Sequence, residues 1–195
     1  MPAAEVTTRE RILRQSLQLF ARKGYDATSV REICEAAGLA KPTLYHFFGS
    51  KEGVYRCLVD GSLDDFRQQI LRVLAGEGSA EERLRRVARL HFSTARAESE
   101  LMRFIFSLIH NPPSSAPKSD FPRFYEGIVE AIAKVVDQGV RGREFRRGPR
   151  EVRMLVLMGA LGEAIHGFLL LGHPELTPAL ADSILNTIVQ GWSTA

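Results

Sequence analysis

The stretch that decides the fold spans residues 28–52 and reads TSVREICEAAGLAKPTLYHFFGSKE. It predicts two short helices joined by a tight turn at Ala36-Ala37-Gly38-Leu39. Ser29 and Glu32 have the spacing of a capping box, which opens the first helix. The glycine admits a left-handed turn, and the alanines before it allow the helices to cross closely. The pattern therefore predicts helix-turn-helix geometry, with a second short helix that opens at Lys41-Pro42.

Helical patterns continue on both sides of this stretch. Thr7 and Glu10 form a second capping-box pair, which opens a helix that ends at Gly24. The segment 111–117, which contains three prolines, is predicted as a loop. Beyond Ser50 the sequence predicts further helices over about residues 51–74, 80–97, 99–110, 119–139, 151–171 and 178–192. The chain is therefore expected to be all-α, with about nine helices.

Positive charge is concentrated in the N-terminal third. Residues 1–57 hold nine Lys and Arg against six Asp and Glu, whereas the rest of the chain holds 17 of each. The whole net charge of +3 thus lies where the helix-turn-helix is predicted, which favours a polyanion as partner for that part. Its second helix is short and carries polar and aromatic groups, which suits a helix laid in the major groove of DNA.

Other classes of protein find little support in the sequence. The two cysteines lack zinc spacing, so we expect no metal site and no disulfide framework. The chain lacks a glycine-rich phosphate loop, a nucleophile elbow and a His–Glu metal pair, so an enzyme is disfavoured and neither catalytic residues nor a cofactor are expected. No window of about 18 uninterrupted apolar residues occurs, so no transmembrane helix is predicted. We expect a cytoplasmic protein without membrane contact.

Several spacings agree at once with those of TetR-family regulators. The similar segments are Thr28–Ile33, Ala36–Leu39, Thr43–Phe48 and Ser50–Glu52, within a resemblance that covers residues 9 to about 56. The resemblance implies a DNA-binding domain over residues 1–53 and a helical ligand-binding and dimerisation domain over residues 54–195. It also implies a homodimeric repressor that leaves double-stranded operator DNA when a small, largely apolar inducer binds. A DNA-binding activator and a ligand-independent regulator remain alternatives.

The resemblance also assigns DNA contacts to individual side chains. The family usually has Ser or Thr where this chain has Ala40, so the second helix loses a capping hydroxyl, at a cost of about 1 kcal/mol. Phe47 is expected in the core rather than on the DNA, and Tyr45 has the core as its alternative. The implied contacts are Thr28 or Ser29 to a phosphate, Lys41, Pro42 and Thr43 to base edges, Tyr45 to the backbone, His46 to the backbone or a base, and Lys51 to a phosphate.

The last two helices are expected to form the dimer. Each has an apolar face, and two such helices can pack against their symmetry copies as a four-helix bundle, although packing within one chain is the alternative. The expected interface residues are Leu155, Met158, Gly162, Ile165, Ile184, Ile188 and Trp192.

A ligand pocket is expected among the aromatic residues of the sixth to eighth helices, where a plain hydrophobic core is the alternative. The candidate residues are Arg103, Phe104, Leu108, His110, Phe124, Tyr125 and His166. The arginine-rich tract from Arg141 to Arg150 is either a solvated connector or a second nucleic-acid patch.

Overall fold

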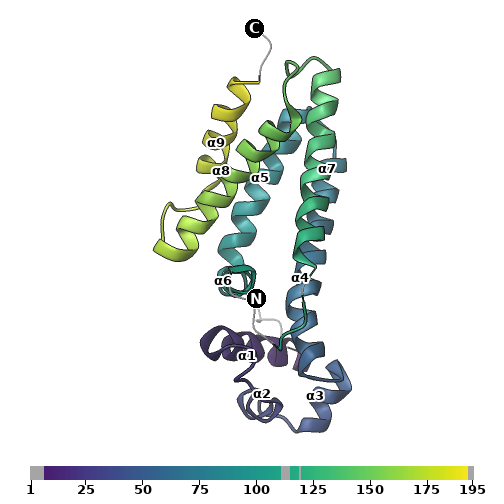
Figure 1. Cartoon of the computed structure of the whole chain (residues 1–195), viewed down its shortest axis with the longest axis vertical. Helices are drawn as coiled ribbons and strands as arrows, with labels where there is room; N and C mark the ends of the chain where they lie inside the picture. The colour runs from purple at the N-terminus through teal and green to yellow at the C-terminus, as the bar shows by residue number, and fades with distance from the viewer. Residues whose placement is uncertain (1–6, 111–114, 119, 193–195) are drawn as a thin grey trace, which may run out of the picture. The chain divides into compact units, whose positions relative to one another are not determined.

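A computed structural model describes residues 7–110, 115–118 and 120–192, and within these ranges the chain forms nine α-helices and no strand (Figure 1). The expectation of an all-α fold is confirmed, and the helix boundaries differ from the expected ones by at most two residues. The helices are α1 (Thr8–Lys23), α2 (Val30–Ala37), α3 (Lys41–Phe48), α4 (Lys51–Ala75), α5 (Ala80–Ala97), α6 (Ser99–His110), α7 (Phe121–Arg141), α8 (Arg150–Leu171) and α9 (Pro178–Gln190).

Two compact units share the chain, and each includes part of α4. The first unit comprises residues 1–64 and 100–121, and the second comprises residues 65–99 and 122–195. This division differs from the expected boundary after residue 53. Val54 and Tyr55 of α4 are buried in the first unit, and Phe104 of α6 stacks on Phe20 of α1 with ring centroids 5.9 Å apart. The core of the first unit is thus completed by helices that follow the helix-turn-helix in sequence.

In the second unit α5 packs against both α8 and α9, and α8 packs against α9. Side-chain hydrogen bonds add to the apolar contacts between α5 and α9. Arg89 Nε donates to Asp182 Oδ1 at 2.8 Å, and the guanidinium of Arg85 donates to Asn186 Oδ1 at 2.7 Å. Hydrogen bonding to Arg89 holds the pKa of Asp182 below its ordinary value.

Helix α8 is apolar on two faces, of which one is buried in the second unit. Leu157, Leu161, Ile165 and Leu169 recur at every fourth position and are buried. A second stripe lies at the surface, and Leu155 within it is 74% exposed. The other exposed apolar residues of this stripe are Val152, Val156, Leu170 and Leu171.

Because α8 is apolar on two faces, its mean hydropathy is high. An 18-residue window within α8 has a mean hydropathy of 1.9 and is 28% buried, so by length and composition alone the helix could cross a membrane. Core helices of soluble proteins meet the same criterion, so one such helix is weak evidence for a span.

Three of the residues expected at the dimer interface lie in the core of the second unit. Ile165, Ile188 and Trp192 are buried within the single chain, because α8 and α9 pack against each other and against α5. Trp192 contacts Phe145, with ring centroids 5.7 Å apart. These three side chains therefore have little surface to offer a partner, whereas Leu155 is exposed and Met158, Gly162 and Ile184 are partly exposed.

Candidate nucleic-acid interface

The turn between α2 and α3 has the geometry that the sequence predicts. The Ser29 hydroxyl accepts the N–H of Glu32 at 3.2 Å, and the Glu32 carboxylate accepts the N–H of Ser29 at 2.8 Å, which completes the capping box. Gly38 is left-handed, with φ 64° and ψ 45°, and its N–H donates to the Glu35 carbonyl. A residue with a side chain would be strained in this conformation, so the glycine fixes the angle at which α3 leaves α2.

A carboxylate ties the end of α1 to the start of α2. Glu32 forms an ion pair with Lys23 of α1 while it caps its own helix through Ser29. The hydrogen bond from Lys23, followed by those from Ser29, lowers the pKa of Glu32 to about 2. Glu32 therefore stays ionised at neutral pH and couples the two helices.

The side chains of α3 lie in four columns, because residues four apart share a face of a helix. One column points inward: Leu44 is 0% exposed and Phe48 is partly buried. The other three columns are Lys41 with Tyr45, Pro42 with His46, and Thr43 with Phe47, and of these six residues all but the half-buried Thr43 are exposed. Leu44 therefore anchors the helix, and the rest of its surface is free to meet a ligand.

Two features of α3 bear on what the sequence predicted. Ala40 occupies the N-cap and forms no side-chain cap, which confirms the loss expected from the sequence. Phe47 was expected in the core, but its side chain is 42% exposed. The expectation was wrong because Phe48, four residues after Leu44, takes the inward position and turns Phe47 to the outside.

The predicted phosphate contacts differ in their environments. Thr28 is 1% exposed and its hydroxyl donates to the Gly24 carbonyl at 2.8 Å, so Ser29 is the member of this pair at the surface. Lys51 Nζ donates to the carbonyls of Tyr25 and Thr28, both at 2.9 Å, and lies 4.1 Å from the centroid of the Tyr25 ring. Two of its three donors thus hold the loop between α1 and α2, so replacing Lys51 would alter the fold as well as any DNA contact.

Gly53 is a positioning residue that sequence reasoning missed. A Cβ at this position would lie 1.9 Å from the carbonyl oxygen of Phe48, so α4 begins in direct contact with the last turn of α3. The N–H of Gly53 donates to the Ser50 hydroxyl at 3.0 Å. Nothing in the sequence marks Gly53, the third residue of α4, as special. It lies close to the Phe48 carbonyl only because of the way the chain turns at Gly49 between α3 and α4.

The expected ligand-pocket residues are divided between the two units. Phe104 and Leu108 are buried in the first unit, where Phe104 contacts Phe20 and Tyr55, and Arg103 is exposed. The side chain of His110 lies outside the described residues. In the second unit Phe124 packs on Phe66, which in turn contacts the buried His91, and His166 lies 3.9 Å from Glu163. Burial lowers the pKa of His91, so its ring is held neutral at physiological pH.

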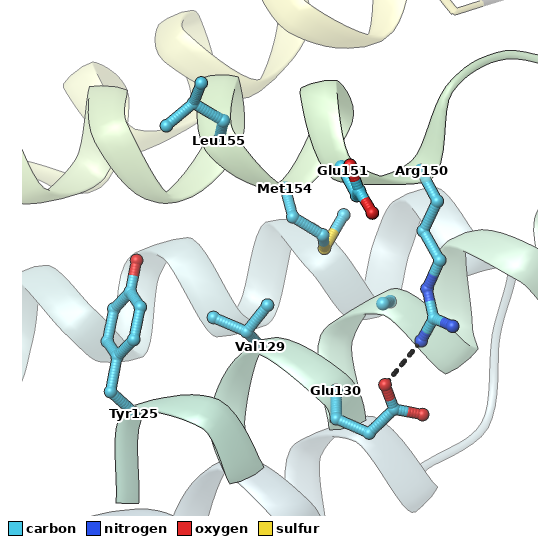
Figure 2. A pocket seen from close by; sticks show the side chains of 8 residues that line it. Tyr125, Val129, Glu130, Arg150, Glu151, Met154 and Leu155 are labelled. Carbon is cyan, nitrogen blue, oxygen red and sulfur yellow. Dashed lines mark hydrogen bonds and ion pairs between the residues drawn. The ribbon is translucent and has the colours of Figure 1, made fainter. Parts of the chain in front are cut away.

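One predicted pocket residue, Tyr125, lines a cavity between α7 and α8 of about 460 Å³. Figure 2 shows Met154 of α8 pointing toward Val129 of α7, with the Tyr125 hydroxyl at one end. At the other end the guanidinium of Arg150 donates to Glu130 at 2.7 Å (Figure 2). Within the described residues no group of three or more His, Cys, Asp or Glu side chains could hold a metal ion.

The N-terminal region is basic and contains two short helices joined by a left-handed glycine turn. The second helix is anchored by one leucine and is otherwise exposed. These features define a helix-turn-helix DNA-binding regulator. Residues 12–57 match the family described as "Bacterial regulatory proteins, tetR family". The chain thus carries the DNA-binding segment of TetR-family transcriptional regulators, a family that is not known as one of enzymes.

Relatives are similar to this chain over different lengths. The fatty acid metabolism regulator protein of Bacillus subtilis (strain 168) is 21% identical over 182 residues, which cover 92% of this chain and 93% of that protein. The HTH-type transcriptional repressor ComR of Escherichia coli (strain K12) is 40% identical over 62 residues, 32% of this chain and 30% of that protein. The structure of the regulator FadR from Bacillus subtilis in complex with stearoyl-CoA has a TM-score of 0.70 at 19% identity, and the match covers 93% of this chain and 97% of that chain.

Proposed function

We propose that the chain is a cytoplasmic, homodimeric repressor that holds operator DNA through α3 and releases it when a small, largely apolar ligand binds. The arrangement of α3 carries the DNA part of this proposal: three of its four columns face outward around the buried Leu44. The outward columns place hydrogen-bonding groups beside aromatic ones, the combination that reads base edges and groove walls.

The columns assign a contact to each side of α3. Pro42 and His46 form the central column and would face the floor of the groove, with His46 toward a base or the backbone. Lys41, with Tyr45 one turn later, would reach one wall, where base edges meet phosphates. Phe47 has no hydrogen-bonding group, so on the opposite side it would make apolar contact with a thymine methyl or a deoxyribose, beside Thr43.

The exposed stripe on α8 supports a dimer. Leu155, Leu170 and Leu171 are apolar and exposed on this helix, and burying them against a symmetry copy would remove them from water. A single helix-turn-helix covers few base pairs, whereas two copies about one helical turn apart can bind two half-sites. Dimerisation through this stripe would thus both cover the exposed apolar side chains of α8 and provide the two helix-turn-helix copies that an operator with two half-sites requires.

Two observations support a ligand. The cavity between α7 and α8 lies within the size range of small-molecule sites, and Val129, Ala133, Met154 and Leu155 give it apolar walls. The FadR structure, which shares the fold, holds stearoyl-CoA. A ligand that binds one state of the dimer better than another would shift the spacing of the two recognition helices and so lower operator affinity.

DNA binding is tested by fluorescence anisotropy with a duplex from the region upstream of this gene, at low and physiological salt. Lys41→Gln is expected to weaken binding about tenfold or more, since a base contact contributes about 1–3 kcal/mol. The matched control is Lys134→Gln on α7, which removes the same charge from an exposed residue and should leave affinity unchanged. Absence of binding to the duplex at low salt, or equal loss in both variants, would refute the role of α3.

The ligand and the direction of regulation need separate measurements. Stearate, the acyl part of the ligand in the FadR structure, should release the duplex from the preformed complex and raise the thermal stability of the free protein. If neither effect occurs while DNA binding stands, the apolar-ligand part of the proposal fails on its own. A reporter under the upstream region should gain expression when the gene is deleted, whereas a loss of expression would identify an activator.

A further inference from the structure

The arginine-rich connector between α7 and α8 has no role in the function proposed above. Its backbone is held in place: Phe145 is buried against Trp192, and the N–H of Arg146 donates to the Trp192 carbonyl at 2.7 Å. Gly139 of α7 makes room for the Phe145 ring, since a Cβ there would lie 2.5 Å from it. The arginines that follow Phe145 therefore start from a fixed backbone.

These arginines surround an open cavity of about 430 Å³ between the connector, the first turns of α8 and the end of α9. The side chains around it are of two kinds, cationic and apolar, and none of the lining residues is acidic. The cationic residues are Arg146, Arg147 and Arg153, and the apolar ones include Val152, Val156 and Trp192.

Arg153 is the most unusual of the three, because it is 7% exposed. Its guanidinium lies 5.1 Å from the centroid of the Trp192 ring and donates to the carbonyl of Arg146. Gly148 allows this burial, since a Cβ there would lie 3.0 Å from the guanidinium. Burial, and next the charge of Arg146, lowers the pKa of Arg153. A buried arginine is normally paired with a carboxylate, yet this guanidinium contacts a carbonyl and an aromatic ring.

The nearby carboxylates are engaged elsewhere. Arg150 donates to Glu130 at 2.7 Å, and its Nε lies 3.7 Å from Asp137. The charge of Asp137 raises the pKa of Arg153 by less than the charge of Arg146 lowers it. Within the described residues, none of the three cavity arginines has an ion pair. Helix α8 also begins at this cavity, with Pro149 as an N-cap that provides no side-chain acceptor, so its first turn adds partial positive charge.

We propose that this cavity binds an organic phosphate, with the phosphate group at Arg146 and Arg147 and the organic part against Val152 and Val156. Guanidinium groups match phosphate oxygens in geometry and charge, and the N-terminus of α8 favours the same anion. The volume is in the range of small-molecule sites, and the apolar wall gives an organic group a surface that a bare ion would not use. An occupant would lie at the margin of the apolar stripe of α8.

The test is isothermal titration calorimetry on the full chain at low salt, with ADP, phenyl phosphate and inorganic phosphate as probes. ADP and phenyl phosphate are expected to bind at least about tenfold more tightly than inorganic phosphate, because burial of the apolar part adds affinity. Arg147→Gln, at an exposed position in the connector, should weaken both organic probes about tenfold. Arg141→Gln is the control, since Arg141 is exposed at the end of α7 and does not line the cavity.

Several results would overturn the proposal. Failure of all three probes to bind would exclude a phosphate site, and equal affinity for the three would exclude the organic part. An equal loss with Arg141→Gln would assign the binding to general electrostatics. If Arg147→Gln weakened a DNA duplex and left ADP unaffected, the connector would be a nucleic-acid surface instead. None of these readouts depends on operator recognition by α3, so the proposal can fail while the proposed function stands, and the reverse.

Discussion

Replacing Gly53 by alanine should destabilise the DNA-binding unit, although helix propensity alone predicts the opposite. Gly53 lies in the first turn of α4, and alanine is favoured over glycine in a helix by about 1 kcal/mol. A Cβ at position 53, however, would lie 1.9 Å from the carbonyl oxygen of Phe48 and 3.0 Å from its carbonyl carbon. The obstacle is backbone, which cannot rotate away as the end of a long side chain can.

The size of the effect follows from these distances. Non-bonded heavy atoms settle at about 3.5 Å, so the end of α3 and the start of α4 must separate by roughly 1 to 1.6 Å. Overpacking of this kind costs about 1–3 kcal/mol, and contact with backbone places it near the upper end. After subtraction of the propensity gain, Gly53→Ala should lower the free energy of unfolding by about 2 kcal/mol. The shift would also disturb the bonds from Lys51 to the Tyr25 and Thr28 carbonyls.

Helix α4 provides a matched control in Gly61, where a Cβ would meet nothing within 4 Å. Gly61→Ala should raise the free energy of unfolding by about 1 kcal/mol, so the two variants should differ by about 3 kcal/mol. Urea unfolding followed by circular dichroism measures the difference, and anisotropy with the operator duplex should show loss of affinity for Gly53→Ala alone. If Gly53→Ala is as stable as Gly61→Ala and binds DNA normally, the close approach of α3 and α4 is not as described.

Three further outcomes are expected. Leu155→Ala should raise the dimer dissociation constant roughly 300-fold in sedimentation equilibrium. The variant removes three carbons from a residue that is 74% exposed in the single chain, which loses roughly 1.8 kcal/mol of burial in each of the two copies. The control, Phe47→Ala, should leave association unchanged. The free energy of unfolding should fall as the pH drops below 6.5 toward the lowered folded-state pKa of His91. In this range the imidazole is protonated in the unfolded chain but stays neutral in the folded one, where it is buried. Above pH 6.5 the stability should be unaffected. A pH series with His91→Gln should lack this decline. Ala40→Ser should raise stability by about 1 kcal/mol by capping α3, and an unchanged urea midpoint would contradict that.

Local patterns account for what the sequence predicted well. The capping boxes at Ser29 and Thr7 and the left-handed turn at Gly38 depend on residues within four positions of each other, so their geometry follows from spacing alone. The same holds for the missing cap at Ala40. These local features place α2 and α3, and the rest of the candidate interface depends on them.

Tertiary packing decides what the sequence could not. Helix α8 is apolar almost all round, so its periodicity does not select the face that packs on α5 and α9, and the expected interface included the buried Ile165. The sequence predicts a phosphate contact for Lys51, but the loop that carries Tyr25 and Thr28 folds over its amine. The close approach at Gly53 and the burial of Arg153 likewise arise between segments distant in sequence or across turns, where spacing gives no signal.

The exposed stripe on α8 links folding to concentration. If Leu155 and its neighbours are covered only in an assembled pair, then every unfolding transition includes dissociation, and the melting temperature rises with the amount of protein in the sample. A regulator present in few copies per cell would then be least robust before it finds a second copy, and operator occupancy would itself protect the protein from unfolding.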